Sequence, residues 1–299
     1  MSLRSYDDHK DTDEADAKSK EEGGLGCPYI AKVHDFGEYN NVSDKFENHS
    51  EGVYGILEKL PMDLYKRATT EGNIFTENDL KSMTTQLLMA LSCMHENNIY
   101  HFDINPCNIM MCDDGNENVK LIDFGMCYTY DENDPTNEEL GLRGAPTYYS
   151  PGFIFRPENE MDNIPFPIDD LWSLAVTICL IFEHNSDYII IELFEYTIKN
   201  TKISRSILIP VFQPKHKTLG RKEWRDMPES IRFCKRIFDT VTVKGEEIQP
   251  NKTFFTLTAA DLLKDPWFKE VKGGKTKRKR KIKNKRKTKR GKSKRKRKN

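Results

Sequence analysis

Apolar residues recur every three or four positions in the stretch from residue 75 to residue 98. One face of it carries six leucines and methionines: Leu80, Met83, Leu87, Leu88, Leu91 and Met94. This spacing predicts an amphipathic helix that packs its apolar face into a core. Thr76 can cap the helix, with Asp79 at the capping-box position.

Other apolar patterns predict strands before this helix, and a hairpin and further helices after it. Strands are expected at 29–36 and 52–60, joined by the polar stretch 39–51. In "CDDGNENVKLIDFG", Asp-Gly predicts a hairpin turn before a strand at 119–122. The long polar segment 126–150 is typical of a functional loop. Helices are expected at 170–183, at 228–241 and in the closing "TAADLLKDPWF".

Charge is divided unevenly along the chain. The 299 residues carry 47 basic and 47 acidic side chains, but 19 of the basic ones and no acidic one lie in residues 272–299. The other residues hold 28 basic against 47 acidic side chains, a formal charge of −19. The sequence therefore predicts an acidic body and a disordered basic tail, after a polar, disordered segment 1–26. The tail has no aromatic residue, so binding to nucleic acid or another polyanion would be non-specific.

Cysteine usage and hydropathy favour an intracellular protein, cytoplasmic or nuclear, with no membrane partner. Seven cysteines are scattered without metal-site spacing, which indicates reduced thiols. The longest apolar run, "LWSLAVTICLIF" from Leu171, is too short to cross a bilayer and predicts a buried helix. The N-terminus offers no apolar signal-peptide segment.

Three oxygen-bearing side chains lie on loops around the predicted hairpin. Asp103 and Asn108 belong to "HFDINPCNIM", and Asp123 follows the second strand. Phosphoryl transfer needs a carboxylate to orient the attacking hydroxyl and oxygen ligands to hold magnesium on the phosphates. Asp103 could accept the hydroxyl proton while Asn108 and Asp123 hold the metal. Alone, these residues are a weak signal, since an Asp-Phe-Gly triplet is usually only a turn.

The order of the motifs makes the signal stronger. "HFDINPCN" resembles the catalytic loop H-R-D-L-K-P-x-N of eukaryotic-type protein kinases, and "DFG" at 123–125 matches their metal-binding loop. "GAPTYYSPG" at 144–152 is similar to the end of their activation segment. Asp170 resembles the buried aspartate that braces their catalytic loop, and "AADLLKDPWF" resembles their last helix. The resemblance covers about residues 27–270.

This resemblance implies an α+β class and a protein-kinase-like fold. The expected domain, 27–271, divides into a remnant β N-lobe with the hinge at 27–60 and a mainly helical C-lobe at 61–271. Such a protein would transfer the γ-phosphate of ATP, with Mg²⁺, to serine or threonine hydroxyls of a protein substrate. The implied catalytic residues are His101, Asp103 and Asn105. The implied cofactor residues are Leu57 as gatekeeper, Glu58 and Leu60 in the adenine-contacting hinge, and Asn108 and Asp123 as metal ligands.

Several positions depart from the family pattern. Phe102 replaces the arginine that receives a phosphorylated activation loop, so switching by phosphate there is not expected. Asn105 replaces the lysine that neutralises the transferring phosphate. Ala145 stands where a threonine usually bonds the catalytic aspartate. Gly152 and Thr256 replace both ends of a buried ion pair, which avoids leaving one charge unpaired.

The N-lobe departs furthest. No Gly-rich loop, strand-three lysine or helix-C glutamate is found before Cys27, and no residue is assigned to that ion pair. Two alternatives therefore stay open. One is a pseudokinase that acts as a scaffold or binding module. The other is a nucleic-acid-associated protein that acts through its basic tail.

Overall fold

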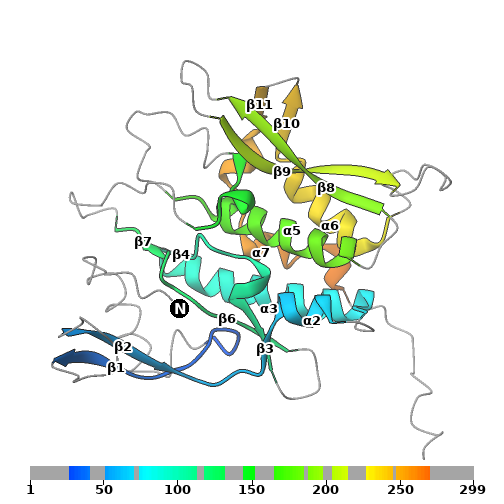
Figure 1. The fold of residues 1–299 in the computed structure, drawn as a ribbon. Helices are drawn as coiled ribbons and strands as arrows, with labels where there is room; N and C mark the ends of the chain where they lie inside the picture. The colour runs from blue at the N-terminus through cyan, green and yellow to red at the C-terminus, as the bar shows by residue number, and fades with distance from the viewer. Residues whose placement is uncertain are drawn as a thin grey trace, which may run out of the picture. The chain divides into compact units, whose positions relative to one another are not determined.

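Figure 1 shows the computed structural model of the chain. The structure describes residues 27–40, 51–70, 74–112, 118–131, 144–151, 165–184, 188–197, 204–214, 227–244 and 247–269. Contacts divide the chain into two units, Met1–Phe268 and Lys269–Asn299. The expected disordered segment 1–26 and the basic tail lie outside the described residues.

Two antiparallel strands, β1 (Val33–Asn40) and β2 (Glu51–Leu57), form the hairpin that precedes the hinge. Both strands are predicted by the sequence, but the first begins later than expected. The residues before it make a different contact, because the amide of Ala31 and the carbonyl of Tyr29 each hydrogen-bond the backbone of Leu121 at 2.9 Å. The pattern of alternating residues identified the strand but not this change of partner.

The predicted amphipathic helix is α3 (Glu77–Glu96). Its capping box forms as expected: the Asp79 amide donates to the Thr76 hydroxyl, and the Thr76 amide donates to the Asp79 carboxylate. All six apolar residues of the predicted face are at most 3% exposed. Helix α3 therefore forms one wall of the main core.

Short strands bring the two predicted functional loops together. Strands β3 (Met62–Asp63), β5 (Ile109–Met111) and β6 (Val119–Leu121) form a sheet in the order β3-β5-β6. Strand β4 (Ile99–Tyr100) pairs with β7 (Tyr128–Thr129). The expected β5–β6 hairpin is confirmed, although its turn at 113–117 lies outside the described residues. Helix α2 (Leu64–Thr69) follows β3 directly.

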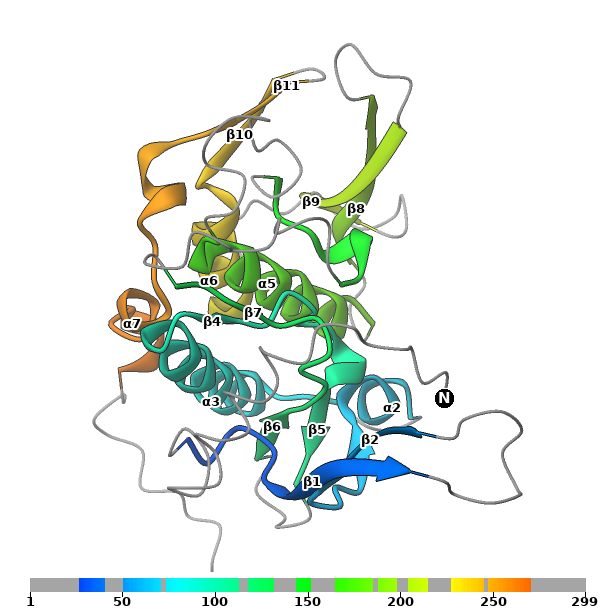
Figure 2. The same ribbon diagram turned by 90° about the vertical axis from the view of Figure 1, so that its left-hand side faces the viewer.

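The apolar run from Leu171 lies in helix α5 (Pro167–His184), which is buried over most of its length. It packs on α6 (Glu229–Phe238), where the rings of Trp172 and Phe238 meet edge to face with centroids 4.9 Å apart. Figures 1 and 2 show β4 and β7 running between α3 and α5. None of the described helices has both the length and the apolar character needed to cross a bilayer.

Two hairpins in the C-terminal half have no counterpart among the predicted elements. They are β8 (Tyr188–Thr197) with β9 (Ser204–Pro214), and β10 (Val241–Lys244) with β11 (Glu247–Pro250). The helix expected at 228–241 ends at Phe238 because β-branched residues follow and pair as a strand. A short helix α7 (Ala259–Leu262) then closes the unit, as the sequence predicts.

The Thr76 cap can be tested against a threonine in the same helix. Thr76→Ala removes the acceptor of the Asp79 amide, so it should lower the free energy of unfolding by about 1 kcal/mol. In the control Thr85→Ala, the lost hydroxyl only donates to the carbonyl of Lys81 one turn back, so the change should stay within about 0.5 kcal/mol. Urea unfolding of the full chain measures both variants, and equal losses would contradict the capping role.

Candidate active site

The loop that carries Asp103 joins β4 to β5 and contains the short 3-10 helix η1 (Pro106–Asn108). Asn105 caps this helix: its Oδ1 accepts the amide of Cys107 at 2.9 Å, and its Nδ2 donates to the carbonyl of Asp103 at 3.0 Å. Both ends of the Asn105 amide group are thus engaged by the backbone of the loop. The side chain shapes the turn around Asp103 in the position where the family has a lysine.

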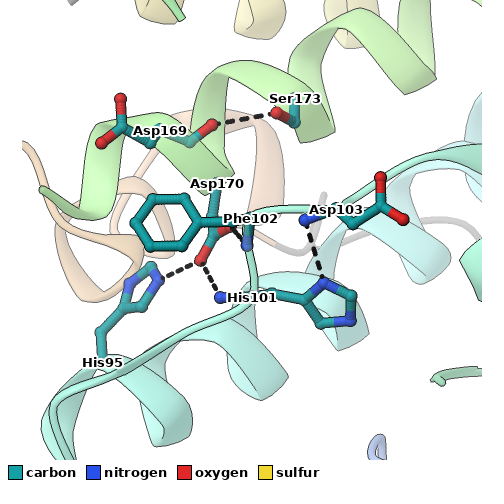
Figure 3. Close-up of polar contacts among 7 residues, drawn as sticks. All are labelled: His95, His101, Phe102, Asp103, Asp169, Asp170 and Ser173. Atoms are coloured by element: carbon teal, nitrogen blue, oxygen red, sulfur yellow. Dashed lines mark hydrogen bonds and ion pairs between the residues drawn. The ribbon is translucent and has the colours of Figure 1, made fainter. Parts of the chain in front are cut away.

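A buried carboxylate holds the start of this loop. Asp170, on α5, accepts the backbone amides of His101 at 2.9 Å and Phe102 at 2.8 Å, and the ring Nε2 of His95 lies 2.9 Å from it (Figure 3). Burial raises the pKa of Asp170, but the hydrogen bond and charge of His95 and the amide of His101 outweigh it and lower the pKa below its ordinary value. Phe102 has φ +58°, an uncommon conformation that these bonds maintain.

Asp103 is oriented by one donor on each carboxylate oxygen. The backbone amide of Ala145 donates to Oδ1 at 2.9 Å, and the Nδ2 of Asn108 donates to Oδ2 at 2.7 Å. The same Nδ2 also donates to the carbonyl of Asp103 at 2.9 Å. Each carboxylate oxygen can accept two hydrogen bonds, so an acceptor position is left for a substrate hydroxyl.

The Asp123 loop is joined to the Asp103 loop through backbone and ring contacts. The amide of Ile122 donates to the carbonyl of Asn108 at 3.0 Å, and the Nε2 of His101 lies 3.1 Å from the carbonyl of Ile122. The His101 ring also contacts the Phe124 ring at 5.3 Å between centroids. His101 is fully buried, so it cannot touch a substrate, and this geometry makes it a positioning residue between the two loops.

The residues expected to hold magnesium fit that ion. Both side-chain hydrogen bonds of Asn108 use its Nδ2, which leaves Oδ1 as a ligand atom. Asp123 is exposed, and its backbone has φ +62°. Magnesium takes oxygen ligands and usually needs only one or two from protein when phosphates supply others. Within the described part of the chain, no group of three or more His, Cys, Asp or Glu could hold a metal by itself.

The expected hinge is anchored to the C-lobe by Glu58. Its carboxylate accepts the backbone amide of Lys32 at 2.7 Å and pairs with Lys120 on β6. Partial burial raises the pKa of Glu58, but the bonds from Lys120 and Lys32 lower it overall. Leu57, at the gatekeeper position, is 43% exposed, and Leu60 is half-buried. Nothing in the sequence pattern marked Lys120 as the partner of Glu58.

The end of the activation segment is held by hydroxyl groups. The Ser150 hydroxyl donates to the carboxylate of Asp169, and the Ser173 hydroxyl lies 2.7 Å from the carbonyl of Tyr148. Ser173 also bonds the carbonyl of Asp169 at 3.0 Å (Figure 3). Gly152, at the family's glutamate position, lies outside the described residues. Polar groups on α5 thus hold the segment at Tyr148 and Ser150, a few residues before Gly152 in the chain.

Comparison with protein families and solved structures confirms the resemblance and the predicted fold. A model described as "Protein kinase domain" matches residues 24–268. The solved structure of the Cydia pomonella granulovirus kinase, PK-1, matches 85% of this chain and 81% of that chain with a TM-score of 0.50. It is 17% identical, so the likeness is one of fold.

The similar curated proteins are considerably longer than this chain. A probable serine/threonine-protein kinase of Dictyostelium discoideum is 29% identical over 191 residues, which are 60% of this chain and 34% of the relative. The probable serine/threonine-protein kinase mkcB of the same organism is 35% identical over 104 residues, 35% of this chain and 13% of the relative. The aligned part thus spans about a third or less of these relatives.

The contacts of the buried Asp170 carboxylate predict a large loss of folding stability when the residue is replaced by the isosteric asparagine. Asp170→Asn removes a buried charge that accepts several donors, so unfolding should become easier by about 3 kcal/mol or more. Asp239→Asn is the control, because it removes only an exposed ion pair with Lys235 and should change stability by at most about 1 kcal/mol. Denaturant unfolding at pH 7 measures both, and a loss below that of the control would refute the brace.

The same variants should differ in their pH dependence. Because the folded protein lowers the pKa of Asp170, its ionisation stabilises the fold above the unfolded pKa, and this contribution is lost as the pH falls through the folded pKa. Wild type should therefore lose its stability advantage over Asp170→Asn as the pH is lowered below about 4. A constant difference down to acid pH would contradict the lowered pKa.

Proposed function

This chain belongs to the protein kinase family, and we propose that it transfers the γ-phosphate of ATP to serine or threonine hydroxyls of proteins. One observation carries the proposal: the fold brings Asp103 and Asn108 into direct hydrogen-bond contact and ties their loop to the Asp123 loop. Phosphoryl transfer depends on this kind of positioning more than on covalent chemistry by the protein.

Asp103 is the residue that would act on the substrate hydroxyl. Its two donors, the Ala145 amide and Asn108, fix the plane of the carboxylate and leave it able to accept the hydroxyl proton. Asn108 and Asp123 would hold Mg²⁺, which when bound offsets the negative charge of the ATP phosphates. Leu57, Glu58 and Leu60 would border the adenine. Because Asn105 offers no positive charge, transfer should be slower than with a lysine at that position.

The metal assignment predicts which variants lose nucleotide binding. MgATP at a hundredfold excess over its dissociation constant should stabilise the full chain by about 2.7 kcal/mol. Asp123→Asn should abolish this shift. The control Asp131→Asn should keep it, because Asp131 is an exposed aspartate eight residues farther along the chain. Thermal unfolding with MgATP, and with ATP plus EDTA, measures the effect. Equal shifts in wild type and Asp123→Asn would exclude Asp123 as a metal ligand.

A variant of Asp103 distinguishes an active enzyme from a pseudokinase by comparing nucleotide binding with phosphate transfer. Asp103→Asn should bind MgATP as wild type does but transfer phosphate at least about a hundredfold more slowly, because only the hydroxyl-orienting step is changed. Transfer from labelled ATP to a mixture of proteins is the readout. A wild type that binds MgATP and transfers no more than Asp103→Asn would be a binding module, and the enzymatic proposal would be wrong.

We also propose that the protein acts inside the cell and that residues 272–299 bind polyanions such as nucleic acid. None of the seven cysteines, all of which lie in the described residues, forms a disulfide, and this supports a reducing compartment. The tail carries 19 basic side chains in 28 residues, enough to neutralise many phosphates. The acidic body, with a formal charge of −19, is the competing partner for the same charges.

Removal of residues 272–299 tests whether the basic tail binds nucleic acid. The full chain should bind duplex DNA of unrelated sequences with similar affinity, and the affinity should fall steeply between two salt concentrations because each neutralised phosphate releases counterions. A chain ending at Val271 should bind much more weakly and with a smaller salt slope. Equal binding by the two chains, or a flat salt dependence of the full chain, would show that the tail is no nucleic-acid anchor.

A further inference from the structure

Four aromatic side chains from three segments of the chain form a small buried cluster that includes Phe102, the residue before Asp103. We call this cluster the aromatic latch; its members are Tyr100 on β4, Phe102 on the catalytic loop, Tyr128 on β7 and Tyr149 after η2 (Pro146–Tyr148), and each is at most 8% exposed. Ring centroids lie 6.0 Å apart for Tyr100 and Phe102, and 6.5 Å apart for Phe102 and Tyr128. The latch is separate from the main core.

The latch joins the activation segment to the catalytic loop without using a charge. Phe102 stands where the family has the arginine that receives a phosphate, and its ring is buried among tyrosines. A phosphate entering this cluster would lose its hydration without gaining a cation from Phe102. Burial of aromatic rings can supply the ordering that a phosphate–arginine pair supplies elsewhere.

Gly144 is the point where the two segments come closest. Its backbone has φ +81°, and a Cβ at this position would lie 2.0 Å from the carbonyl oxygen of Phe102. Only glycine allows this approach. The hydroxyl of Tyr149 donates to the carbonyl of Gly144 at 3.1 Å and so connects the latch to the same peptide segment.

The close approach of Gly144 to Phe102 places the backbone amide of Ala145 against the carboxylate of Asp103. The N–H of Ala145 lies 2.9 Å from Oδ1 of Asp103, although Ala145 has no hydroxyl of its own. A hydrogen bond from a backbone amide to a carboxylate is charge-assisted, so it is strong enough to orient the side chain of Asp103.

We propose that Tyr149 and Gly144 are positioning residues for phosphoryl transfer: through the aromatic latch they seat the Ala145 amide on Asp103 and keep the site assembled without a phosphorylated activation segment. This inference rests on the proposed kinase function. It differs from a purely structural role because the hydroxyl of Tyr149 bonds the peptide group whose N–H contacts Asp103, so removing the hydroxyl should change the rate while the ring stays packed.

Tyr149→Phe tests the inference because it keeps the ring and removes the hydroxyl. At saturating MgATP, the rate of phosphate transfer should fall about ten- to a hundredfold, with the KM for ATP and the Tm nearly unchanged. Tyr130→Phe is the matched control: its ring packs against the latch from outside, and its rate should stay at the wild-type value. Wild type treated with phosphatase should also keep its rate.

Three kinetic results would overturn the proposal. The first is a wild-type rate in Tyr149→Phe. The second is a loss that disappears when the assay temperature is lowered, which would indicate lost stability alone. The third is loss of wild-type activity on phosphatase treatment, which would show that a phosphate assembles the site.

Hydrogen exchange separates failure of the latch from failure of the proposed function. The Ala145 amide should exchange slowly in wild type and in Tyr130→Phe, and faster in Tyr149→Phe and in Gly144→Ala, where the Cβ pushes the segment away from Phe102. This readout needs no catalysis. If wild type transfers no phosphate, the kinase proposal fails. Hydrogen exchange of the Ala145 amide still tests whether Tyr149 and Gly144 hold that amide on Asp103. Fast exchange of Ala145 in wild type, or equal exchange in wild type and Tyr149→Phe, would disprove the latch.

Discussion

The buried carboxylate of Asp170 is the contact on which the candidate site depends. It is fully buried on α5 and accepts amides from two consecutive residues of the catalytic loop, with His95 as a third partner. Those bonds hold Phe102 in an uncommon backbone conformation. This conformation of Phe102 directs the His101 side chain toward the Asp123 loop. It also directs the Asp103 side chain toward Asn108 and the amide of Ala145. A packed helix thus fixes the geometry of a polar loop.

Around this brace, uncharged residues stand at three positions where the family has a charged one: Phe102, Asn105 and Gly152. Phe102 packs with tyrosines where the family has an arginine that binds a phosphate, and the Ser150 hydroxyl bonds the Asp169 carboxylate two residues before Gly152 in the chain. Asn105 caps the loop where a lysine would contact phosphate. The ring of Phe102 and the amide group of Asn105 both make their contacts within the chain and need no phosphate as a partner. Among the described residues, charged contacts remain between Asp170 and His95 at the brace and between Glu58 and Lys120 at the hinge.

The sequence predicted what depends on side-chain identity and spacing. The six apolar positions of α3, its capping box and the residues Asp103, Asn108 and Asp123 could all be read from residue types. The donor to Asp103 could not be predicted from residue types. Ala145 donates through its backbone amide, and every residue except proline has one. The start of β1 was misplaced because residues 29–31 pair with Leu121, far along the chain. The β8–β9 hairpin could not be predicted in this way, because the residues between its strands, 198–203, contain no Gly or Pro to signal a turn.

The central claim is that Asp103, Asn108 and Asp123 form one magnesium-dependent phosphoryl-transfer site. A crystal structure of the full chain with Mg²⁺ and a non-hydrolysable ATP analogue tests it most directly. The account predicts a metal about 2.1 Å from the Oδ1 of Asn108 and from a carboxylate oxygen of Asp123. Asp103 should then keep its bonds to Asn108 and the Ala145 amide and face the γ-phosphate without binding the metal. A nucleotide bound away from these loops, or a metal on Asp103 in place of Asn108 and Asp123, would contradict it.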